Sequence, residues 1–283
     1  MSFQKDESWT ILSPIEESIK QKIETVGTPL KDWNIKINRG ILTGYNEAFI
    51  ISGKKRQEIL DNCQSEDEEA RTAELIRPIL RGRDIKKYNY EFANIYLICT
   101  FPAMHYNIDD YPAIRDYLLT FDKRKLEQSG EKNIDGVQGN NSRKRTNNKW
   151  FEMQDSIGYW DDFNKQHIAW KAVGKNLAFA ILEPGKYLSA PASMIVSKNN
   201  EWLLCFLQSK VGKYFFMNNS DTTGMGDIML NIQSLVKFSV PIPNPQTENK
   251  IKQALASNNF GYIDQLVYKS YGFDSDEIGF IEN

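Results

Sequence analysis

The alternation of apolar and polar positions predicts an amphipathic helix near the start of the chain. Ile15, Ile19 and Ile23 recur at helical spacing and therefore share one face. Ser13 is the N-cap of a capping box, because Pro14 stands in the first turn and a glutamate follows three residues after the serine. The glycine at position 27 ends the pattern. The sequence thus predicts a helix between residues 13 and 27.

Helical and strand patterns are intermixed over the rest of the chain. Strands are predicted over residues 33–37, 47–51, 94–100, 166–173, 177–182 and 194–197. Helices are predicted over residues 54–60, 66–76, 200–217, 246–256 and 262–271, and one begins at Pro112. Since these elements do not alternate as βαβ units, the expected fold class is α+β. It should have a mixed, mainly antiparallel sheet, flanking helices, long loops and a C-terminal helical tail.

Two segments interrupt the periodic pattern. Residues 129–148 are dense in glycine, asparagine and basic residues and lack periodicity, which predicts a long loop. The proline run over residues 241–245 indicates a boundary. We therefore expect an N-terminal helix and linker over residues 1–30, a central domain over 31–243 and a C-terminal helical segment over 244–283.

The composition is that of a globular protein: 283 residues, 41% hydrophobic and 25% charged. No apolar run approaches the ~20 residues that span a bilayer, and the polar N-terminus lacks a signal-peptide core. The odd, widely spaced Cys63, Cys99 and Cys205 indicate neither a metal site nor a disulfide framework. We expect a cytoplasmic protein with no membrane partner.

Positive charge is concentrated in one part of the sequence. The net charge is −2, yet residues 123–149 hold eight basic and three acidic side chains, so that this segment is +5 and the remainder −7. Such asymmetry is typical of a nucleic-acid-binding surface on an acidic body. A solvated loop with uneven charge is the alternative.

Residues 40–51, a glycine-rich loop running into an apolar stretch, precede a segment with five basic side chains at residues 75–88. This pair resembles the TaqI-like specificity domain, which lies downstream of the methyltransferase domain in many adenine-N6 DNA methyltransferases and fused restriction-modification enzymes. Similar motifs follow in order at residues 150–153, 168–170, 203–210, 238–243 and 262–272. The motif at 238–243 is also similar to type I restriction specificity subunits. The resemblance extends from Trp33 to the end of the chain.

The resemblance implies a module that selects a DNA sequence for a separate catalytic domain. The implied partners are double-stranded DNA, which the long loops would face, and an adenine-N6 methyltransferase domain or subunit. The terminal helical segments would dock on that subunit. The alternative is a protein-interaction module that docks on a methyltransferase without strong DNA binding of its own.

The candidate DNA-binding residues lie in four segments: Arg143, Lys144, Arg145, Asn147 and Lys149; Thr43, Gly44 and Asn46; Arg81 and Arg83; Thr223 and Gly224. Arginine can read a guanine edge, asparagine an adenine edge, and lysine binds phosphate as a point charge. Glycines allow backbone amides to approach a phosphate closely. Each segment has a structural alternative: a solvated loop at 143–149, ordinary loops at 43–46 and 223–224, and a structural corner in which Arg83 and Asp84 bond neighbouring backbone. Trp150 would either stack at the surface or anchor in the core.

No motif indicates catalysis. The chain has no Pro-Pro pair, and hence no Asn/Asp-Pro-Pro-Tyr or -Phe methyltransferase loop, and no phosphate-binding Gly-x-x-x-x-Gly-Lys sequence. The acid-x-Lys spacing of Asp84 and Lys86 is common by chance, and His167 fits a structural role in an apolar strand better than that of a base. We therefore predict a non-enzymatic module with no catalytic residue, metal site or cofactor.

Overall fold

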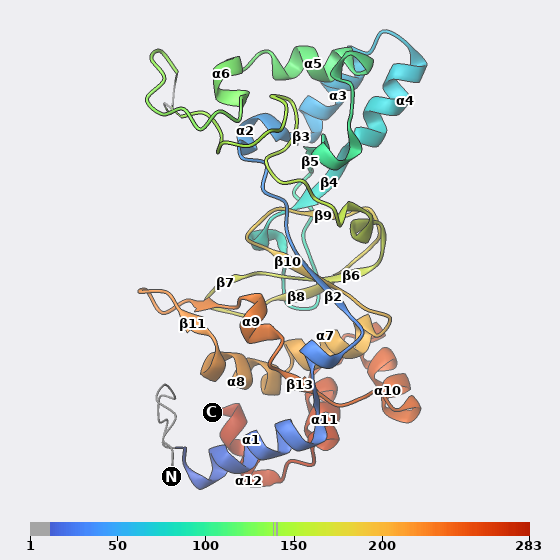
Figure 1. Cartoon of the computed structure of the whole chain (residues 1–283). Coiled ribbons are helices and arrows are strands. Elements are labelled where there is room, and N and C mark those ends of the chain that lie inside the picture. The colour runs from blue at the N-terminus through green and yellow to red at the C-terminus, as the bar shows by residue number, and fades with distance from the viewer. Residues whose placement is uncertain (1–11, 138, 140) are drawn as a thin grey trace. The chain divides into compact units, whose positions relative to one another are not determined.

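The computed structural model describes residues 12–137, 139 and 141–283 (Figure 1). The chain divides into two compact units. The central unit is Lys36–Asn200, and the terminal unit combines the chain up to Ile35 with Glu201–Asn283. This division differs from the predicted segments 1–30, 31–243 and 244–283, because residues 201–243 pack with the terminal helices. The functional role given to each segment stays a prediction.

The described part of the central unit contains two four-stranded sheets. The first is antiparallel and has the order β2 (Lys36–Arg39), β10 (Ser193–Val196), β6 (His167–Trp170) and β8 (Phe179–Leu182). The second joins β3 (Ile50–Ser52), β5 (Ile95–Ile98) and β4 (Ile76–Leu80) in antiparallel order, and β9 (Tyr187–Leu188) pairs with β4 in parallel. The α+β prediction with a mainly antiparallel sheet is confirmed.

Helices accompany the second sheet and precede the long loop (Figure 1). They are α2 (Asn46–Phe49), α3 (Gly53–Asp61), α4 (Glu66–Leu75), α5 (Pro112–Leu118) and α6 (Lys123–Leu126). One hydrophobic core includes Phe49, Leu97 and Ile114, all fully buried. The strand predicted over 47–51 is wrong in its first half, where the chain forms α2 before β3 begins.

The terminal unit is mainly helical. Its helices are α1 (Pro14–Val26), α8 (Lys210–Asn219), α9 (Ile232–Leu235), α10 (Pro245–Ala256), α11 (Phe260–Tyr271) and α12 (Ser275–Glu282). Helix α7 (Asn200–Gln208) belongs to it from Glu201 on. The short strand β7 (Val173–Gly174) belongs to the central unit. Its strands pair as β1 (Thr28–Pro29) with β13 (Ser239–Val240) and β11 (Asp221–Thr222) with β12 (Ile228–Met229). The predicted helix over 200–217 is divided at Ser209, whose hydroxyl accepts from the Gly212 N–H and caps α8.

Buried polar groups hold the terminal helices together. Glu277 of α12 accepts from Lys22 Nζ at 2.6 Å and from Ser18 Oγ at 2.7 Å, both on α1. Trp202 Nε1 donates to the Pro241 carbonyl at 2.8 Å, and Tyr271 Oη donates to the Ser239 carbonyl at 2.6 Å. These bonds explain why residues 201–243 belong with both ends of the chain.

His167 begins β6 with a fully buried ring. Its Nδ1 lies 2.8 Å from the Lys165 carbonyl oxygen, so this nitrogen carries the hydrogen. Nε2 has no hydrogen-bond partner among the described residues, and the His167 and Phe163 rings pack at a steep angle with their centres 6.0 Å apart. Burial lowers the pKa of His167 below its ordinary value, against the opposing effect of the Lys165 carbonyl.

We expect His167 to make the central unit less stable in mild acid. Below a pH of about 6.5, His167 is protonated in the unfolded chain but stays neutral in the folded protein. The free energy of unfolding therefore falls with pH until the lower pKa of the folded state is reached. Thermal unfolding of the wild type from pH ~7.5 to pH ~5 should show this loss, and the loss should be smaller in His167→Leu. His105→Gln, a change at an exposed histidine, is the control and should behave as wild type. An undiminished acid loss in His167→Leu would contradict the assignment.

Candidate nucleic-acid interface

Residues 129–149, called the basic loop from here on, fold back on themselves after α6. The Gly130 N–H donates to the Arg143 carbonyl and the Ser142 N–H donates to the Glu131 carbonyl, each at 3.0 Å. Lys132 and Asn141 form an antiparallel bridge further along. The predicted loop thus has an ordered two-stranded base, although its described residues form no long strand.

Gln128 holds the base of this loop from inside. Its side chain is buried, and Nε2 donates to the carbonyls of Glu152 at 3.0 Å and Met153 at 3.3 Å. Its Oε1 accepts from Thr146 Oγ1 at 2.7 Å. Asn148 adds a bond from Nδ2 to the Met153 carbonyl at 3.0 Å. The end of the loop is therefore tied to residues 152–153.

Arg143 lies at the centre of the interface and is only 4% exposed. A guanidinium has five N–H groups, and here each meets a backbone carbonyl. Nε and Nη2 both donate to Leu126, Nη1 donates to Thr43 at 3.2 Å and to Glu152 at 2.6 Å, and Nη2 also donates to Trp150 at 2.6 Å. The guanidinium carbon lies 5.0 Å from the centre of the Phe49 ring.

This arrangement corrects the DNA contact expected of Arg143. Every donor is already bonded and the side chain is enclosed, so no N–H remains for a base edge or a phosphate. Burial lowers the pKa of Arg143 to about 10, partly offset by the Glu152 carboxylate. The group still carries its charge at neutral pH, and we assign it a structural role.

The glycine loop, residues 40–46, meets the basic loop through Arg143. Thr43 is buried: its Oγ1 donates to Asn46 Oδ1 at 2.7 Å and accepts from the Tyr45 N–H at 3.0 Å. Gly44 has φ +76°, and a Cβ there would lie 2.9 Å from Arg143 Cδ. Thr43 is therefore a structural residue, whereas Gly44 and Asn46 are exposed beside the basic loop.

The remaining predicted residues of the basic loop point into solvent. Lys144, Arg145, Asn147 and Lys149 are all exposed. In the described part of the chain no carboxylate pairs with Lys144, Arg145 or Lys149. Arg124 differs, since Nη2 lies 2.6 Å from Asp122 Oδ2. The charge of Arg124 is thus locally neutralised, while the three loop cations are not.

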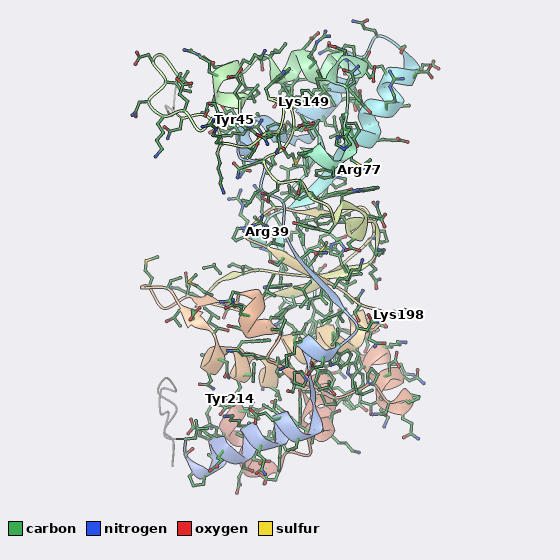
Figure 2. The ribbon with its side chains drawn as sticks, in the orientation of Figure 1. Arg39, Tyr45, Arg77, Lys149, Lys198 and Tyr214 are labelled. Carbon is green, nitrogen blue, oxygen red and sulfur yellow. The ribbon has the colours of Figure 1, made fainter. Side chains whose placement is uncertain are left out.

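Aromatic rings support several lysines of this surface. Lys149 Nζ lies 5.5 Å from the Phe151 ring centre, Lys123 Nζ 5.7 Å from that of Trp150, and Lys125 Nζ 4.4 Å from that of Tyr45. Figure 2 labels Tyr45 and Lys149 and shows both at the end of the central unit that holds α6. Trp150 packs against the core, which favours the anchoring alternative for this residue.

Arg81 and Arg83 lie in a corner that the basic loop does not share. Arg81 Nε and Nη2 donate to the two carboxylate oxygens of Asp84, each at 3.0 Å. The Arg81 backbone N–H donates to Asp84 Oδ2 at 2.8 Å. Burial alone would raise the pKa of Asp84, but these bonds and the charge of Arg81 hold it below its ordinary value. Asp84 thus forms its corner with Arg81 and not with Arg83, which is exposed and whose DNA contact stays a prediction.

Thr223 and Gly224 belong to the terminal unit, in the turn between β11 and β12. The Thr223 N–H donates to the Asp227 carbonyl and the Gly226 N–H to the Thr223 carbonyl, both at 2.8 Å. Thr223 Oγ1 accepts from the Asp227 N–H at 3.1 Å. Gly224 is exposed at the tip of this turn.

Sequence reasoning did not select Gln128, Gly130 or Lys123 as parts of the interface. In the sequence, Lys123 is marked only by its contribution to the positive charge of residues 123–149. Gln128 and Gly130 carry no local signal, because their importance arises from segments that fold over them. Gly130 has φ +73°, and a Cβ there would lie 3.0 Å from Arg145 Cβ.

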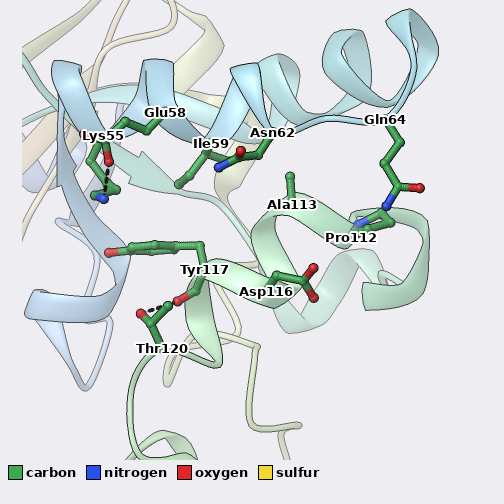
Figure 3. A pocket seen from close by; sticks show the side chains of 10 residues that line it. All are labelled: Lys55, Glu58, Ile59, Asn62, Gln64, Pro112, Ala113, Asp116, Tyr117 and Thr120. Atoms are coloured by element: carbon green, nitrogen blue, oxygen red, sulfur yellow. Dashed lines mark hydrogen bonds and ion pairs between the residues drawn. The ribbon is translucent and has the colours of Figure 1, made fainter.

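The central unit also contains a pocket of about 430 Å³ between α3 and α5 (Figure 3). Several of its polar side chains are bonded within the pocket: Lys55 pairs with Glu58, and Thr120 Oγ1 donates to the Tyr117 carbonyl at 2.7 Å. We assign no ligand to it.

The fold and the family comparison together place the chain among known specificity domains. The fold is an α+β domain that presents an ordered basic loop. The model of the TaqI-like C-terminal specificity domain matches residues 77–240, more than half of the chain, and the chain therefore belongs to this family. None of the curated proteins matches it.

Two solved structures are similar. The type IIG restriction endonuclease BpuSI has a TM-score of 0.52 and 15% identity, with 91% of this chain and 33% of BpuSI covered. The type IIL restriction-modification enzyme MmeI in complex with DNA has a TM-score of 0.49 and 10% identity, with 92% of this chain and 37% of MmeI covered. The chain spans about a third of the BpuSI chain, and this likeness concerns the fold. Within the described ranges, no helix combines the length and the apolar character needed to cross a membrane.

Replacement of Arg143 should loosen the interface. In Arg143→Ala the carbonyls of Leu126, Thr43, Glu152 and Trp150 lose their bonds from the guanidinium, and only those of Thr43 and Glu152 keep a second donor among the described residues. We expect a loss of roughly 3 kcal/mol in the stability of the central unit. Faster hydrogen–deuterium exchange over residues 41–46, 126–131 and 150–154 would locate the effect. Arg124→Ala removes an exposed, paired arginine and should leave the stability close to that of the wild type. Equal effects of the two variants would contradict the central role of Arg143.

Proposed function

We propose that this chain recognises a DNA target sequence for a restriction-modification system. It would position an adenine-N6 methyltransferase, or a methyltransferase–endonuclease, whose catalytic domain lies outside these 283 residues. Membership of a specificity-domain family supports the class of function. The observation that carries the proposal is the set of cations without a carboxylate partner, Lys144, Arg145 and Lys149, on a loop whose base is fixed by hydrogen bonds in the described structure.

The exposed side chains suit different parts of a DNA duplex. Arg145 and Asn147 have the donor and acceptor geometry that reads guanine and adenine edges in the major groove. Lys144 and Lys149 suit phosphates, and Gly44 and Asn46 border the same surface. Arg83 and the Thr223–Gly224 turn would add contacts from elsewhere on the chain.

The groups that sequence spacing offered for chemistry are engaged in structural roles. Asp84 is held by Arg81, and His167 is buried with one nitrogen bonded to a backbone carbonyl. This supports a module without catalysis of its own, with α1 and the helices α10–α12 as its docking surface for the catalytic partner.

Adding the chain to a purified adenine-N6 methyltransferase from an adjoining reading frame should confer site-selective methylation; unchanged selectivity would count against the partnership.

The salt dependence of DNA binding tests the phosphate contacts. For a mixed-sequence duplex, the slope of log affinity against log salt has a magnitude of about 0.9 for each phosphate that the protein neutralises. We expect Lys149→Ala and Lys144→Ala each to lower this magnitude by about one and to weaken binding to all sequences alike. The measurement is a fluorescence-anisotropy titration of the full chain at several salt concentrations.

Arg124→Ala is the matched control for this titration. Arg124 lies in the same basic segment, but Asp122 neutralises its charge. The salt slope of Arg124→Ala should therefore equal that of the wild type. Slopes unchanged in both lysine variants would move the DNA surface away from the basic loop.

A further inference from the structure

We infer that Arg143 is a positioning residue for base recognition, which acts through Arg145 without touching DNA, and that Gly130 shares this task. The inference rests on the proposed function and deepens it. It separates the residue that reads a base, Arg145, from the two residues that hold it in place, Arg143 and Gly130.

The backbone around Arg145 is fixed on both sides. The Arg143 carbonyl accepts from the Gly130 N–H, and the Thr146 N–H donates to the Gln128 carbonyl, each at 3.0 Å. The Arg143 N–H donates to the Glu127 carbonyl at 3.1 Å. Lys144 and Arg145 thus form a short exposed step between residues that are bonded to the segment leaving α6.

Arg143 supplies the inner anchor of this step. Its guanidinium joins the carbonyls of Leu126, Thr43, Glu152 and Trp150, which come from separate stretches of chain. Because Arg145 follows Arg143 by only two residues, the position of its backbone is fixed by the bonds of Arg143. A lysine in place of Arg143 keeps the charge but has three donors on one nitrogen and cannot reach all of these acceptors.

Gly130 supplies the lateral constraint. Its missing side chain leaves the space that Arg145 occupies: a Cβ at position 130 would lie 3.0 Å from Arg145 Cβ and 3.4 Å from the Arg145 backbone nitrogen. An alanine here is strained at φ +73° and requires Arg145 to shift by a few tenths of an ångström. This contact does not involve the Arg143 side chain.

Such anchoring affects sequence preference more than overall affinity. A bidentate bond to a guanine edge needs the guanidinium within a fraction of an ångström of its place, whereas attraction to phosphates changes slowly with distance. Loosening the step should therefore reduce discrimination between bases while leaving non-specific binding and its salt slope in place.

The test begins with the full wild-type chain and a pool of randomised duplex DNA at low salt. Sequences enriched by binding define a motif. Affinities for that motif and its single-base-pair variants are then measured for wild type, Arg145→Ala, Arg143→Lys, the double variant and Gly130→Ala. Arg124→Ala is the control, and thermal unfolding confirms that each variant is folded.

We expect Arg145→Ala to lower discrimination at one base pair by about tenfold. Arg143→Lys and Gly130→Ala should lower it at the same base pair, with salt slopes equal to that of the wild type. The double variant should be no worse than Arg145→Ala alone, since coupled residues are non-additive. Arg124→Ala should discriminate as the wild type does.

The failures are distinguishable. If the wild type enriches no motif, the proposed function is overturned and this inference with it. If a motif is enriched but Arg143→Lys keeps full discrimination, or if its loss multiplies with that of Arg145→Ala, only the inference is overturned. Should Arg143→Lys fail to fold, Gly130→Ala decides: unchanged discrimination at the Arg145 base pair overturns the inference.

Discussion

The buried guanidinium of Arg143 is the interaction on which the rest of the interface depends. A buried charge is costly unless its hydrogen bonds are satisfied, and here backbone carbonyls satisfy every donor. Those carbonyls belong to the end of α6, the glycine loop and residues 150–152. Because one planar group must reach all of them, the three segments have a single compatible arrangement. The order of a loop that lacks regular secondary structure follows from this constraint.

The same constraint sorts the positive charge of the basic segment. Arg143 has no donor left for a ligand, because backbone carbonyls take all of its hydrogen bonds, and the charge of Arg124 is offset by Asp122. Lys144, Arg145 and Lys149 remain outside, with no carboxylate partner in the described structure. The charge available to a ligand is therefore smaller than the sequence count of basic residues implies. An interface of this kind relies on the placement of a few cations more than on their number.

The sequence predicted what local patterns determine. The capping box of α1 and the α+β class are confirmed, because spacing and caps act within a few residues. The division at Ser209 was readable in principle, since serine is a common N-cap, but the apolar run on either side concealed it. The burial of Arg143 was not readable, because one of its acceptors, the Thr43 carbonyl, lies 100 residues away in the sequence. Arg143 and Arg145 look alike in one dimension, and only the fold distinguishes them.

Two glycines, the DNA-binding candidate Gly44 and Gly130, lie against the two arginines. Gly44 leaves space for the buried Arg143, and Gly130 leaves space for the exposed Arg145. The framework thus consists of Arg143, Gln128 and the two glycines, none of which needs to face a ligand. Among the described residues, side chains at positions 144, 145, 147 and 149 make none of the bonds that hold the loop. Substitutions there change the chemical groups offered to a ligand and leave the framework intact, which is the arrangement that a surface of selectable specificity requires.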